Sequence, residues 1–162
     1  MLDFYYIDNA YIQYLRTYDT QVSYNKNEKR PYIGIVFYIN GIEYYAPLSS
    51  PKPKHKTMKN SKDLRKINGG QYGVINFNNM IPVSQGSLIH IDINSWPDPK
   101  HRRFLQKQYF AIQADYHNII KTANELYQLV TAPDDKLTGY ELTVKQRCCN
   151  FALLESIYLG YK

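Results

Sequence analysis

Residues 32–46 read YIGIVFYINGIEYYA, the clearest structural signal in the chain. Aromatic and β-branched side chains dominate both halves of it, which is typical of β-strands. Between the halves stands Asn40-Gly41, the strongest short signal for a β-hairpin, because both turn residues must adopt positive φ. The stretch therefore predicts two antiparallel strands, 32–39 and 42–46, joined by a two-residue turn.

Patterns of hydrophobic residues on either side of the hairpin predict further strands and helices. We expect strands at 4–7, 72–77 and 88–93, and a short apolar segment at 80–83 packed beneath the sheet. Asp8 can cap a first helix that ends near Tyr18. A long helix is expected over 100–131, with a break around 115–118 and a stop at Pro133, and a last helix over 149–158.

These elements together predict the class of fold. Between the hairpin and the strand at 72–77 lies the stretch 47–70, rich in Lys and Arg, which we expect to be a long loop. We find no internal repeat and no linker, so the prediction is one domain covering residues 1–162. Its class is α+β: a strongly curved antiparallel sheet with helices packed against it.

The charge of the chain points to an anionic partner. The net charge is +6 and the pI is about 9.1, which makes nucleic acid the first expectation and an anionic membrane surface the second. The chain has 17 tyrosines, whose flat apolar faces suit unstacked bases as well as a half-buried sheet, and composition leaves these two uses open. The N-terminal residues have no signal-peptide pattern, and no apolar run is long enough to span a bilayer, so we expect a cytoplasmic protein without membrane contact.

Cysteine and histidine are too sparse to predict a metal site. Cys148 and Cys149 are adjacent and rarely pair with one another, which fits a reducing compartment. The four histidines show no metal-ligand spacing with one another or with the cysteines, and the glycines form no phosphate-binding loop. We therefore expect neither a metal nor a cofactor.

One segment carries residues suited to phosphate chemistry. Residues 46–56 read APLSSPKPKHK, which places two hydroxyl groups and an amine close together where the second hairpin strand enters the basic stretch. Pro51 restricts Ser50 to an extended conformation, so the Ser50 side chain has a defined direction. Read alone, the segment is more simply interpreted as a solvated lysine-rich loop with a Ser-Pro turn.

The segment does not stand alone, because several blocks of the sequence resemble one family in the same order. PLSSPK at 47–52 is similar to the Pro-Leu-(Thr/Ser)-Ser-Pro-Lys signature of the ToxN/AbiQ family of toxins from type III toxin–antitoxin systems. Further blocks that resemble the family are FYYI at 4–7, YIQYL at 11–15, RPYIGIV at 30–36, GVINFNNMIPV at 73–83 and FALLE at 151–155. The resemblance covers nearly the whole chain.

The resemblance implies a fold, an activity and a partner. Such proteins have a compact fold akin to the Kid/MazF toxin barrels. They cut A-rich RNA without a metal and leave a 2′,3′-cyclic phosphate. They are inhibited by an RNA pseudoknot made from a tandem repeat, with which they form closed rings, and they serve in phage defence by abortive infection or in plasmid maintenance.

The family's catalytic residues map onto particular positions of this chain. In such a reaction the 2′-hydroxyl of the RNA attacks, so the protein must orient it, move protons and stabilise charge on the phosphate. We expect Lys52, buried beside Arg30, to act as base, acid or electrostatic stabiliser, and Ser50 to contact the scissile phosphate with support from Ser49. Arg30 stands where the family has Lys and should clamp phosphate. Tyr11 matches a family tyrosine and either orients RNA or is a packed helix residue.

Other basic and amide side chains are candidates for RNA binding. Lysines of the basic stretch would follow the phosphates of the RNA, so that binding weakens as salt rises. Some relatives have an aromatic residue at the position of Lys54, which leaves a stacking platform there in doubt. The expected RNA-binding residues are Lys54, His55, Lys56, Lys59, Lys62, Arg65, Lys66, Asn76, Lys100, Arg102 and Arg103.

Two other functions stay open at this point. The first is a non-catalytic RNA-binding module, in which Ser50→Ala would leave every activity unchanged. The second is a nuclease of different specificity, such as one that cuts tRNA, which would leave discrete tRNA fragments in cells. A purely structural role is the least compatible with the Ser-Ser-Pro-Lys segment.

Overall fold

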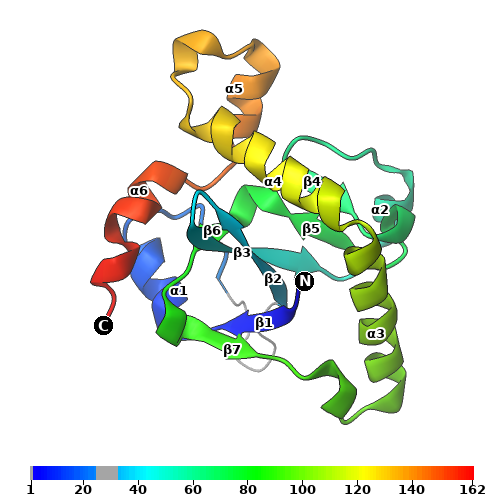
Figure 1. Cartoon of the computed structure of the whole chain (residues 1–162). Helices are drawn as coiled ribbons and strands as arrows, with labels where there is room; N and C mark the ends of the chain where they lie inside the picture. The colour runs from blue at the N-terminus through cyan, green and yellow to red at the C-terminus, as the bar shows by residue number, and fades with distance from the viewer. Residues whose placement is uncertain (1, 25–32) are drawn as a thin grey trace.

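The computed structural model describes residues 2–24 and 33–162, and its centre is the hairpin expected from the sequence (Figure 1). Strands β2 (Gly34–Ile39) and β3 (Ile42–Ser49) pair antiparallel, with Ile39 opposite Ile42. Asn40 and Gly41 have φ values of 51° and 79°, as a two-residue hairpin turn requires. Strand β3 runs three residues beyond the predicted end, and Ser49 is its last residue.

The hairpin is the middle of an open antiparallel sheet. The strand order is β4-β5-β3-β2-β1-β7, and a further short strand, β6, also pairs with β3. Since β4 and β7 lie at opposite ends of this order and do not pair, the expected barrel core is not confirmed: no closed or strongly curled sheet forms among the residues that the structure describes. The other strands are β1 (Phe4–Ile7), β4 (Leu64–Lys66), β5 (Val74–Asn76), β6 (Ile81–Pro82) and β7 (Leu88–His90).

Helices surround this sheet, and the long helix is broken where the sequence indicates. Helices α3 and α4 follow one another along one side of the sheet, α1 and α6 lie at the other side, and α5 projects beyond it (Figure 1). Asp115 is the single residue between α3 and α4. The α-helices are α1 (Asn9–Arg16), α2 (Pro53–Thr57), α3 (Pro99–Ala114), α4 (Tyr116–Thr131), α5 (Gly139–Gln146) and α6 (Phe151–Ile157). Short 3-10 turns are η1 (Asn68–Gly70), η2 (Phe77–Asn79), η3 (Gln85–Ser87), η4 (Ile93–Ser95), η5 (Asp134–Lys136) and η6 (Tyr158–Gly160).

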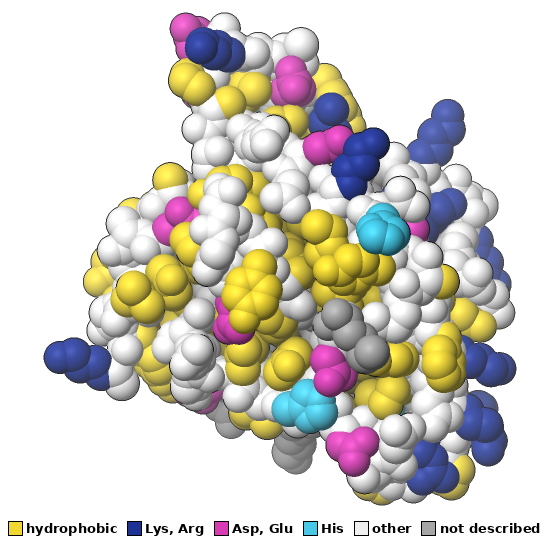
Figure 2. Space-filling model, viewed as in Figure 1, with side chains coloured by type: hydrophobic (Ala, Val, Ile, Leu, Met, Phe, Trp, Pro, Cys, Tyr) yellow, Lys and Arg dark blue, Asp and Glu magenta, His cyan; other side chains and the backbone are white. Residues whose placement is uncertain are grey.

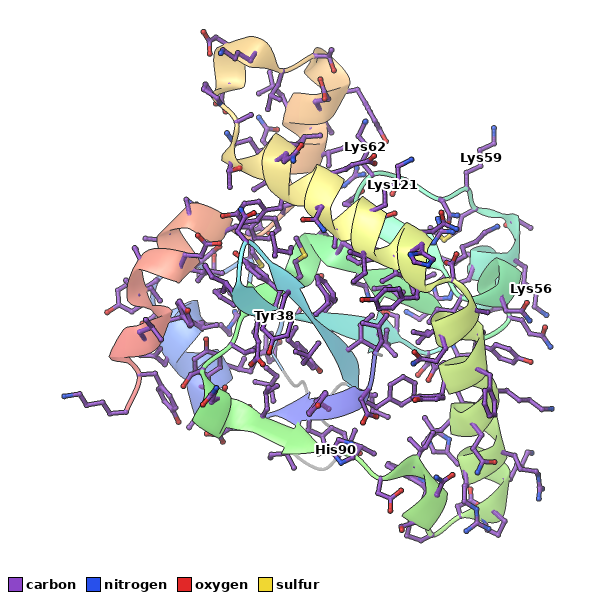
Figure 3. All side chains as sticks on the ribbon, in the orientation of Figure 1. Tyr38, Lys56, Lys59, Lys62, His90 and Lys121 are labelled. Atoms are coloured by element: carbon purple, nitrogen blue, oxygen red, sulfur yellow. The ribbon has the colours of Figure 1, made fainter. Side chains whose placement is uncertain are left out.

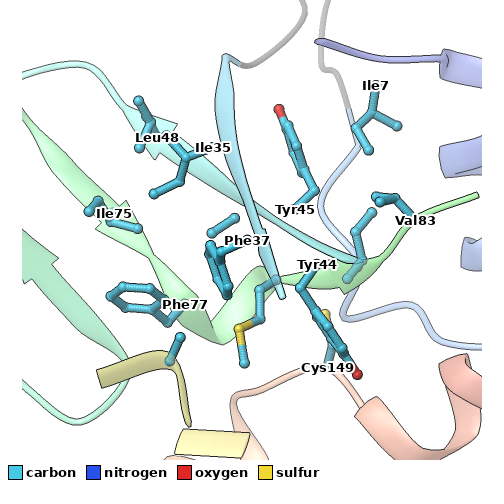
Figure 4. Packing of buried hydrophobic residues seen from close by; sticks show 14 of the residues in the cluster. Ile7, Ile35, Phe37, Tyr44, Tyr45, Leu48, Ile75, Phe77, Val83 and Cys149 are labelled. Carbon is cyan, nitrogen blue, oxygen red and sulfur yellow. The ribbon is translucent and has the colours of Figure 1, made fainter. Parts of the chain in front are cut away.

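Aromatic side chains of the hairpin form the centre of the hydrophobic core (Figure 4). Phe37 meets Phe77 edge to face with ring centroids 6.2 Å apart, and Tyr44 meets Phe151 in the same way at 5.8 Å. The buried Tyr44 hydroxyl donates a 2.5 Å hydrogen bond to Glu155 of α6, so its polar tip is satisfied. These contacts join the sheet, η2 and the last helix into one core.

Three local predictions need correction. The stretch 47–70 is not a continuous loop, because it holds the end of β3, α2 and β4. The segment 80–83 does not pack beneath the sheet but joins it, since Ile81 and Pro82 pair with Tyr45 and Tyr44. Helix α5 was not expected, although Thr138 and Glu141 form a capping box at its start, a pattern that the sequence carries.

Candidate functional site

The end of β3 positions the first hydroxyl of the candidate site. Ser49 lies opposite Val74 of β5, and the Asn76 side chain donates a 2.6 Å hydrogen bond from Nδ2 to the Ser49 Oγ. Since the Ser49 oxygen accepts this bond, its own O–H is left to donate elsewhere. Asn76 therefore orients Ser49, and the prediction that its amide reads RNA bases is not supported by this geometry.

Two glycines bring a neighbouring turn against residues 49–56, which we call the Ser-Pro-Lys loop. Gly73 has φ of +92°, and a Cβ on it would lie 2.0 Å from the Ser49 carbonyl oxygen. Gly70 also has φ of +92°, and a Cβ there would lie 2.2 Å from the carbonyl oxygen of His55. Only glycine allows both this backbone conformation and this close approach, so the turn 67–73 fixes the loop's path.

The loop presents Ser50 and Lys52 to solvent. Both residues are exposed, so the prediction that Lys52 is buried is wrong. The backbone of Lys52 is held in place, because its N–H donates to His55 Nδ1 at 3.1 Å and its carbonyl accepts from the His55 N–H at 2.9 Å. Arg30, the expected neighbour of Lys52, lies outside the described residues.

His55 anchors the loop and does not face solvent. Its residue is 3% exposed, which contradicts a direct RNA-binding role. Burial, followed by the positive charges of Lys54 and Lys52, lowers the pKa of His55. The neutral ring then keeps Nδ1 as an acceptor for the Lys52 N–H, so His55 holds the backbone of Lys52 in place.

Lysines of this loop and of the residues that follow it form a positively charged rim. The lysine rim consists of Lys54, Lys56, Lys59 and Lys62, which are all exposed. Figure 2 shows Lys and Arg side chains along one border of the molecule, and Figure 3 shows Lys56, Lys59 and Lys62 on that side. Lys62 lines a cleft with Thr122 of α4, and the adjacent Lys121 extends the rim onto that helix. The Lys121 side chain is 72% exposed, and its ammonium lies 3.9 Å from the Glu125 carboxylate.

Lys121 was missed from the sequence, where it appears only as one charge on an amphipathic helix. The fold places the neighbouring Thr122 of this helix at the same cleft as Lys62, which is distant in sequence, and no local pattern records that arrangement. A row of exposed cations of this kind can follow a phosphate backbone.

Arg65 and Lys66 do not belong to the rim in the way we expected. Arg65 forms a two-point ion pair with Asp115, with distances of 2.5 Å and 2.8 Å, and its side chain is only 22% exposed. Burial raises the pKa of Asp115, but hydrogen bonds from Arg65 and Asn118 outweigh it and hold that pKa below its usual value. Arg65 therefore ties β4 to the α3–α4 junction. Lys66 is half-buried on the same strand.

The expected second basic surface lies at the start of α3. Lys100 and Arg103 are exposed, while Arg102 is half-buried and donates to the Trp96 carbonyl oxygen at 3.3 Å. Helix α3 has 16 residues, so its start lies about 24 Å from its junction with α4. This surface is separate from the junction and from the Arg65–Asp115 pair.

Tyr11 is buried and lies away from the Ser-Pro-Lys loop. It is 0% exposed, and its hydroxyl donates a 2.5 Å hydrogen bond to the Pro82 carbonyl oxygen. Pro82 pairs with Tyr44, five residues before Ser49 on β3, or roughly 16 Å along an extended strand. The packed-tyrosine interpretation fits this position, and Tyr11 does not join the Ser-Pro-Lys loop.

The part of the chain that the structure describes holds neither a metal-binding cluster nor a membrane-spanning helix. Within residues 2–24 and 33–162, no three His, Cys, Asp or Glu side chains cluster in a way that could hold a metal ion. The helices of the same residues include none with the length and apolar character needed to cross a bilayer.

Comparison with known proteins gives one family. Residues 3–159 match the family described as toxin ToxN, type III toxin–antitoxin system. An endoribonuclease ToxN from Pectobacterium atrosepticum is 34% identical, over 99% of this chain and 94% of the relative.

Solved structures give the same result. One, from a study of selective toxin inhibition by a non-coding RNA pseudoknot in bacterial type III systems, superposes with a TM-score of 0.83 at 32% identity, covering 99% of this chain and 97% of the other. Another, of AbiQ, described as a lactococcal anti-phage endoribonuclease of a type III system, gives 0.77 at 28% identity, covering 99% and 98%.

Proposed function

The chain belongs to the ToxN family of toxins from type III toxin–antitoxin systems, and we propose that it is an endoribonuclease whose single domain spans residues 1–162. The family members compared above are named endoribonucleases, and the match covers nearly the whole chain. Cutting of RNA by this chain is the function that its basic rim and its Ser-Pro-Lys loop support best.

The observation that carries the proposal is the way the Ser-Pro-Lys loop is held. Asn76 fixes Ser49, and Gly73 packs against the Ser49 carbonyl, so the exposed Ser50 and Lys52 leave the sheet from a rigid support. Fixed donors beside a reacting phosphate can stabilise its developing charge without reorganising during the reaction. A merely solvated lysine loop would need no such support.

The proposed reaction uses the RNA itself as the nucleophile. A ribose 2′-hydroxyl attacks the adjacent phosphorus, the bond to the 5′-oxygen of the next nucleotide breaks, and a 2′,3′-cyclic phosphate and a 5′-hydroxyl remain. Ser50 donates a hydrogen bond to the scissile phosphate, Ser49 supports it, and the Lys52 ammonium stabilises the extra negative charge. Arg30 clamps a neighbouring phosphate. We propose that this reaction takes place at A-rich sites and needs no metal.

The proposed partner is an inhibitory RNA. The neighbour structure concerns toxin inhibition by an RNA pseudoknot, which supports an antitoxin of that kind, encoded by tandem repeats, for this chain. We propose that toxin and RNA form a closed ring in the cytoplasm and that the system acts in phage defence by abortive infection. The lysine rim supplies the charges that such an RNA needs.

Growth and cleavage assays test the proposal. Expression of the chain alone should arrest growth, and Ser50→Ala or Lys52→Ala should relieve the arrest. The matched controls are Ser156→Ala and Lys136→Ala, exposed residues on α6 and η5 that lie outside the Ser-Pro-Lys loop. Circular dichroism should show all four variants folded, which separates loss of chemistry from loss of structure.

The products and the conditions test the mechanism. Purified protein should cut an A-rich RNA in the presence of EDTA, and the new 3′ end should resist extension until the cyclic phosphate is opened. Cleavage that stops on chelation, or folded Ser50→Ala and Lys52→Ala variants as active as the controls, would overturn the proposed mechanism. Short tandem repeats upstream of the gene would support the RNA antitoxin.

A further inference from the structure

The ring of His55 takes part in the hydrogen bonding of the Ser-Pro-Lys loop, and the proposed mechanism does not use its titration. The ring Nδ1 accepts the Lys52 N–H at 3.1 Å, and the His55 N–H donates to the Lys52 carbonyl oxygen at 2.9 Å. These two bonds form the first turn of α2, in which Lys52 is the N-cap residue. One side chain thereby links the start of this helix to a residue of the proposed active site.

The sequence around Lys52 leaves its backbone few other attachments. Pro51 and Pro53 flank it, and neither has an N–H, so the Lys52 N–H is the only backbone donor of residues 51–53. Because Lys52 precedes a proline, it is restricted to an extended conformation, and its φ and ψ are −130° and 154°. The one backbone donor of this segment is therefore committed to the His55 ring.

The protein packs tightly around His55, so the ring has little room to turn away while the loop stays in place. The residue is buried, and η1 lies on one side of it. A Cβ on Gly70 of η1 would lie 2.2 Å from the His55 carbonyl oxygen, which shows how closely the two backbones approach. A buried ring that is held at its Nδ1 and at its backbone cannot change its hydrogen bonding without moving the residues bonded to it.

A proton on Nδ1 would break this arrangement. A neutral imidazole offers Nδ1 as an acceptor when its hydrogen is on Nε2, whereas both nitrogens of the protonated ring are donors. The Lys52 N–H would then face a second donor, and the hydrogen bond between them would be lost. A donor that is left without an acceptor in a buried position is destabilising, so the loop has to open and let water in.

The charges around the ring act in the same direction. Of the residues that the structure describes, Lys54 and Lys52 are the charged groups that act on His55, and both are positive. The element most closely packed against α2 is η1, Asn68–Gly70, which has no titratable side chain. Burial and the two lysine charges lower the pKa of His55, so the ring is neutral near pH 7 and takes up its proton only in acid.

We propose that His55 is a positioning residue whose protonation switches RNA cleavage off. When the ring takes a proton from solvent at Nδ1, its hydrogen bond with the Lys52 N–H breaks, the start of α2 opens, and the Lys52 ammonium moves away from the scissile phosphate. The inference rests on the proposed function, because it concerns the regulation of that same site. It assigns the loss of activity in acid to a residue that does not touch the RNA.

This assignment differs from the usual explanation of a rate that falls at low pH. Such a fall is ordinarily attributed to protonation of a general base that takes the proton of the nucleophile. Here the group that titrates is buried behind the loop, and it acts through the position of Lys52. A displacement of about 1 Å at a catalytic group can lower a rate about a hundredfold, so opening of the loop is sufficient to stop cleavage.

The first test compares single-turnover RNA cleavage by the wild-type protein and by His55→Asn between about pH 5 and about pH 8. The asparagine side chain offers an acceptor oxygen close to the place of Nδ1 and takes up no proton in this range. Dividing the wild-type rate by the variant rate at each pH cancels the pH dependence of the remaining chemistry. This ratio should be constant near pH 7 and fall about tenfold per pH unit once the pH is below the pKa of His55.

The matched control is His117→Asn, which changes an exposed histidine of α4 outside the Ser-Pro-Lys loop. The ratio of the wild-type rate to the rate of this variant should not vary with pH. Circular dichroism at each pH should show that all three proteins are folded, which separates opening of the loop from loss of the whole fold.

A second measurement keeps the proposal testable if His55→Asn fails to fold. In the wild-type protein without RNA, an NMR titration should show the Lys52 backbone amide resonance shifting with the same midpoint as the His55 ring. Lys54→Gln should move both midpoints to higher pH, because it removes a positive charge that acts on the ring.

Failure of this inference can be told apart from failure of the proposed function. The NMR titration needs no RNA, so it reports on the link between His55 and Lys52 even if the protein has no nuclease activity. If the protein cuts RNA but the ratio of rates stays constant through the pH at which the His55 ring titrates, His55 is not the switch. A Lys52 amide resonance that does not move when the ring titrates would also overturn the proposal.

Discussion

A single methyl group at Gly73 should disable the site while leaving most of the fold intact. A Cβ on this residue would lie 2.0 Å from the Ser49 carbonyl oxygen and 3.3 Å from the Pro51 nitrogen. To restore an ordinary contact of 3.4 Å, the Ser49 carbonyl would have to retreat by about 1.4 Å. A displacement of 1 Å at a catalytic group can cost about a hundredfold in rate, so Gly73→Ala should lose at least that much RNA cleavage.

Gly41→Ala is the matched control for the free-energy cost of holding alanine at a positive φ. Gly41 also has a positive φ, +79°, but nothing lies within 4 Å of its would-be Cβ at the tip of the hairpin. Each substitution should cost about 1–2 kcal/mol for holding alanine at positive φ, or roughly 2–8 °C in Tm. Only Gly73→Ala adds the clash with the Ser-Pro-Lys loop.

The assay is single-turnover cleavage of an A-rich RNA at a temperature below the Tm of both variants. Thermal melting curves of the two variants are measured in parallel to establish those Tm values. Gly73→Ala should be about a hundredfold slower than Gly41→Ala although both remain folded at the assay temperature. Rates for the two variants within about threefold of each other would refute the argument that Gly73 positions the loop.

Three further predictions concern ion pairs and charge. Arg147→Ala removes the partner of the buried Asp63 carboxylate and should lower the free energy of unfolding by about 3 kcal/mol, seen in urea melts. Burial raises the pKa of Asp63, but hydrogen bonds from Arg147 and Ser61, together with the Arg147 charge, hold it below its usual value, so the difference from wild type should shrink as pH falls below about 4. Burial lowers the pKa of His55, so the unfolded chain binds a proton at this residue more readily than the folded chain does. The free energy of unfolding should therefore fall as pH drops below about 6.5. His55→Gln should flatten this part of the plot of unfolding free energy against pH, and an unchanged plot would contradict the burial argument. Lys56→Ala should reduce the slope of log binding constant against log salt concentration by about one phosphate contact, as filter binding at several salt concentrations would reveal. Arg65→Ala should leave that slope nearly unchanged and should instead lower the Tm in thermal melting, because Arg65 is engaged by Asp115.

Local signals in the sequence predicted the elements that depend on neighbouring residues. The Asn40-Gly41 turn, the cap at Asp8 and the break of the long helix at Asp115 are all confirmed. Each of these depends on the conformational preference of a few adjacent side chains, which the tertiary fold did not override.

Predictions that depended on distant contacts were less successful. The apolar segment 80–83 was expected to pack beneath the sheet, but residues 81 and 82 pair with β3. This pairing depends on the edge of β3 that faces away from β2. Helix α5 has only eight residues, too few for a clear hydrophobic periodicity, and only its capping box signals it in the sequence.

The candidate site divides in the same way. The resemblance of residues 47–52 to a family signature located the Ser-Pro-Lys loop, because that motif is contiguous in the sequence. The burial of His55, the engagement of Arg65 by Asp115 and the position of Tyr11 could not be inferred in this way, since each contact that decides them joins separate elements.

The α+β class, the resemblance to the ToxN family, the central hairpin, the basic stretch and the hydroxyl–amine motif could all be inferred from the amino-acid sequence. These are properties of composition and of short contiguous patterns. Only the folded chain shows that Asp115 engages Arg65 while the rim lysines are exposed, and that Asn76 and His55 hold the Ser-Pro-Lys loop. The physical reason is that charge neutralisation, burial and cavities arise between segments distant in sequence, where one ion pair or one glycine contact can turn a candidate ligand-binding residue into a support.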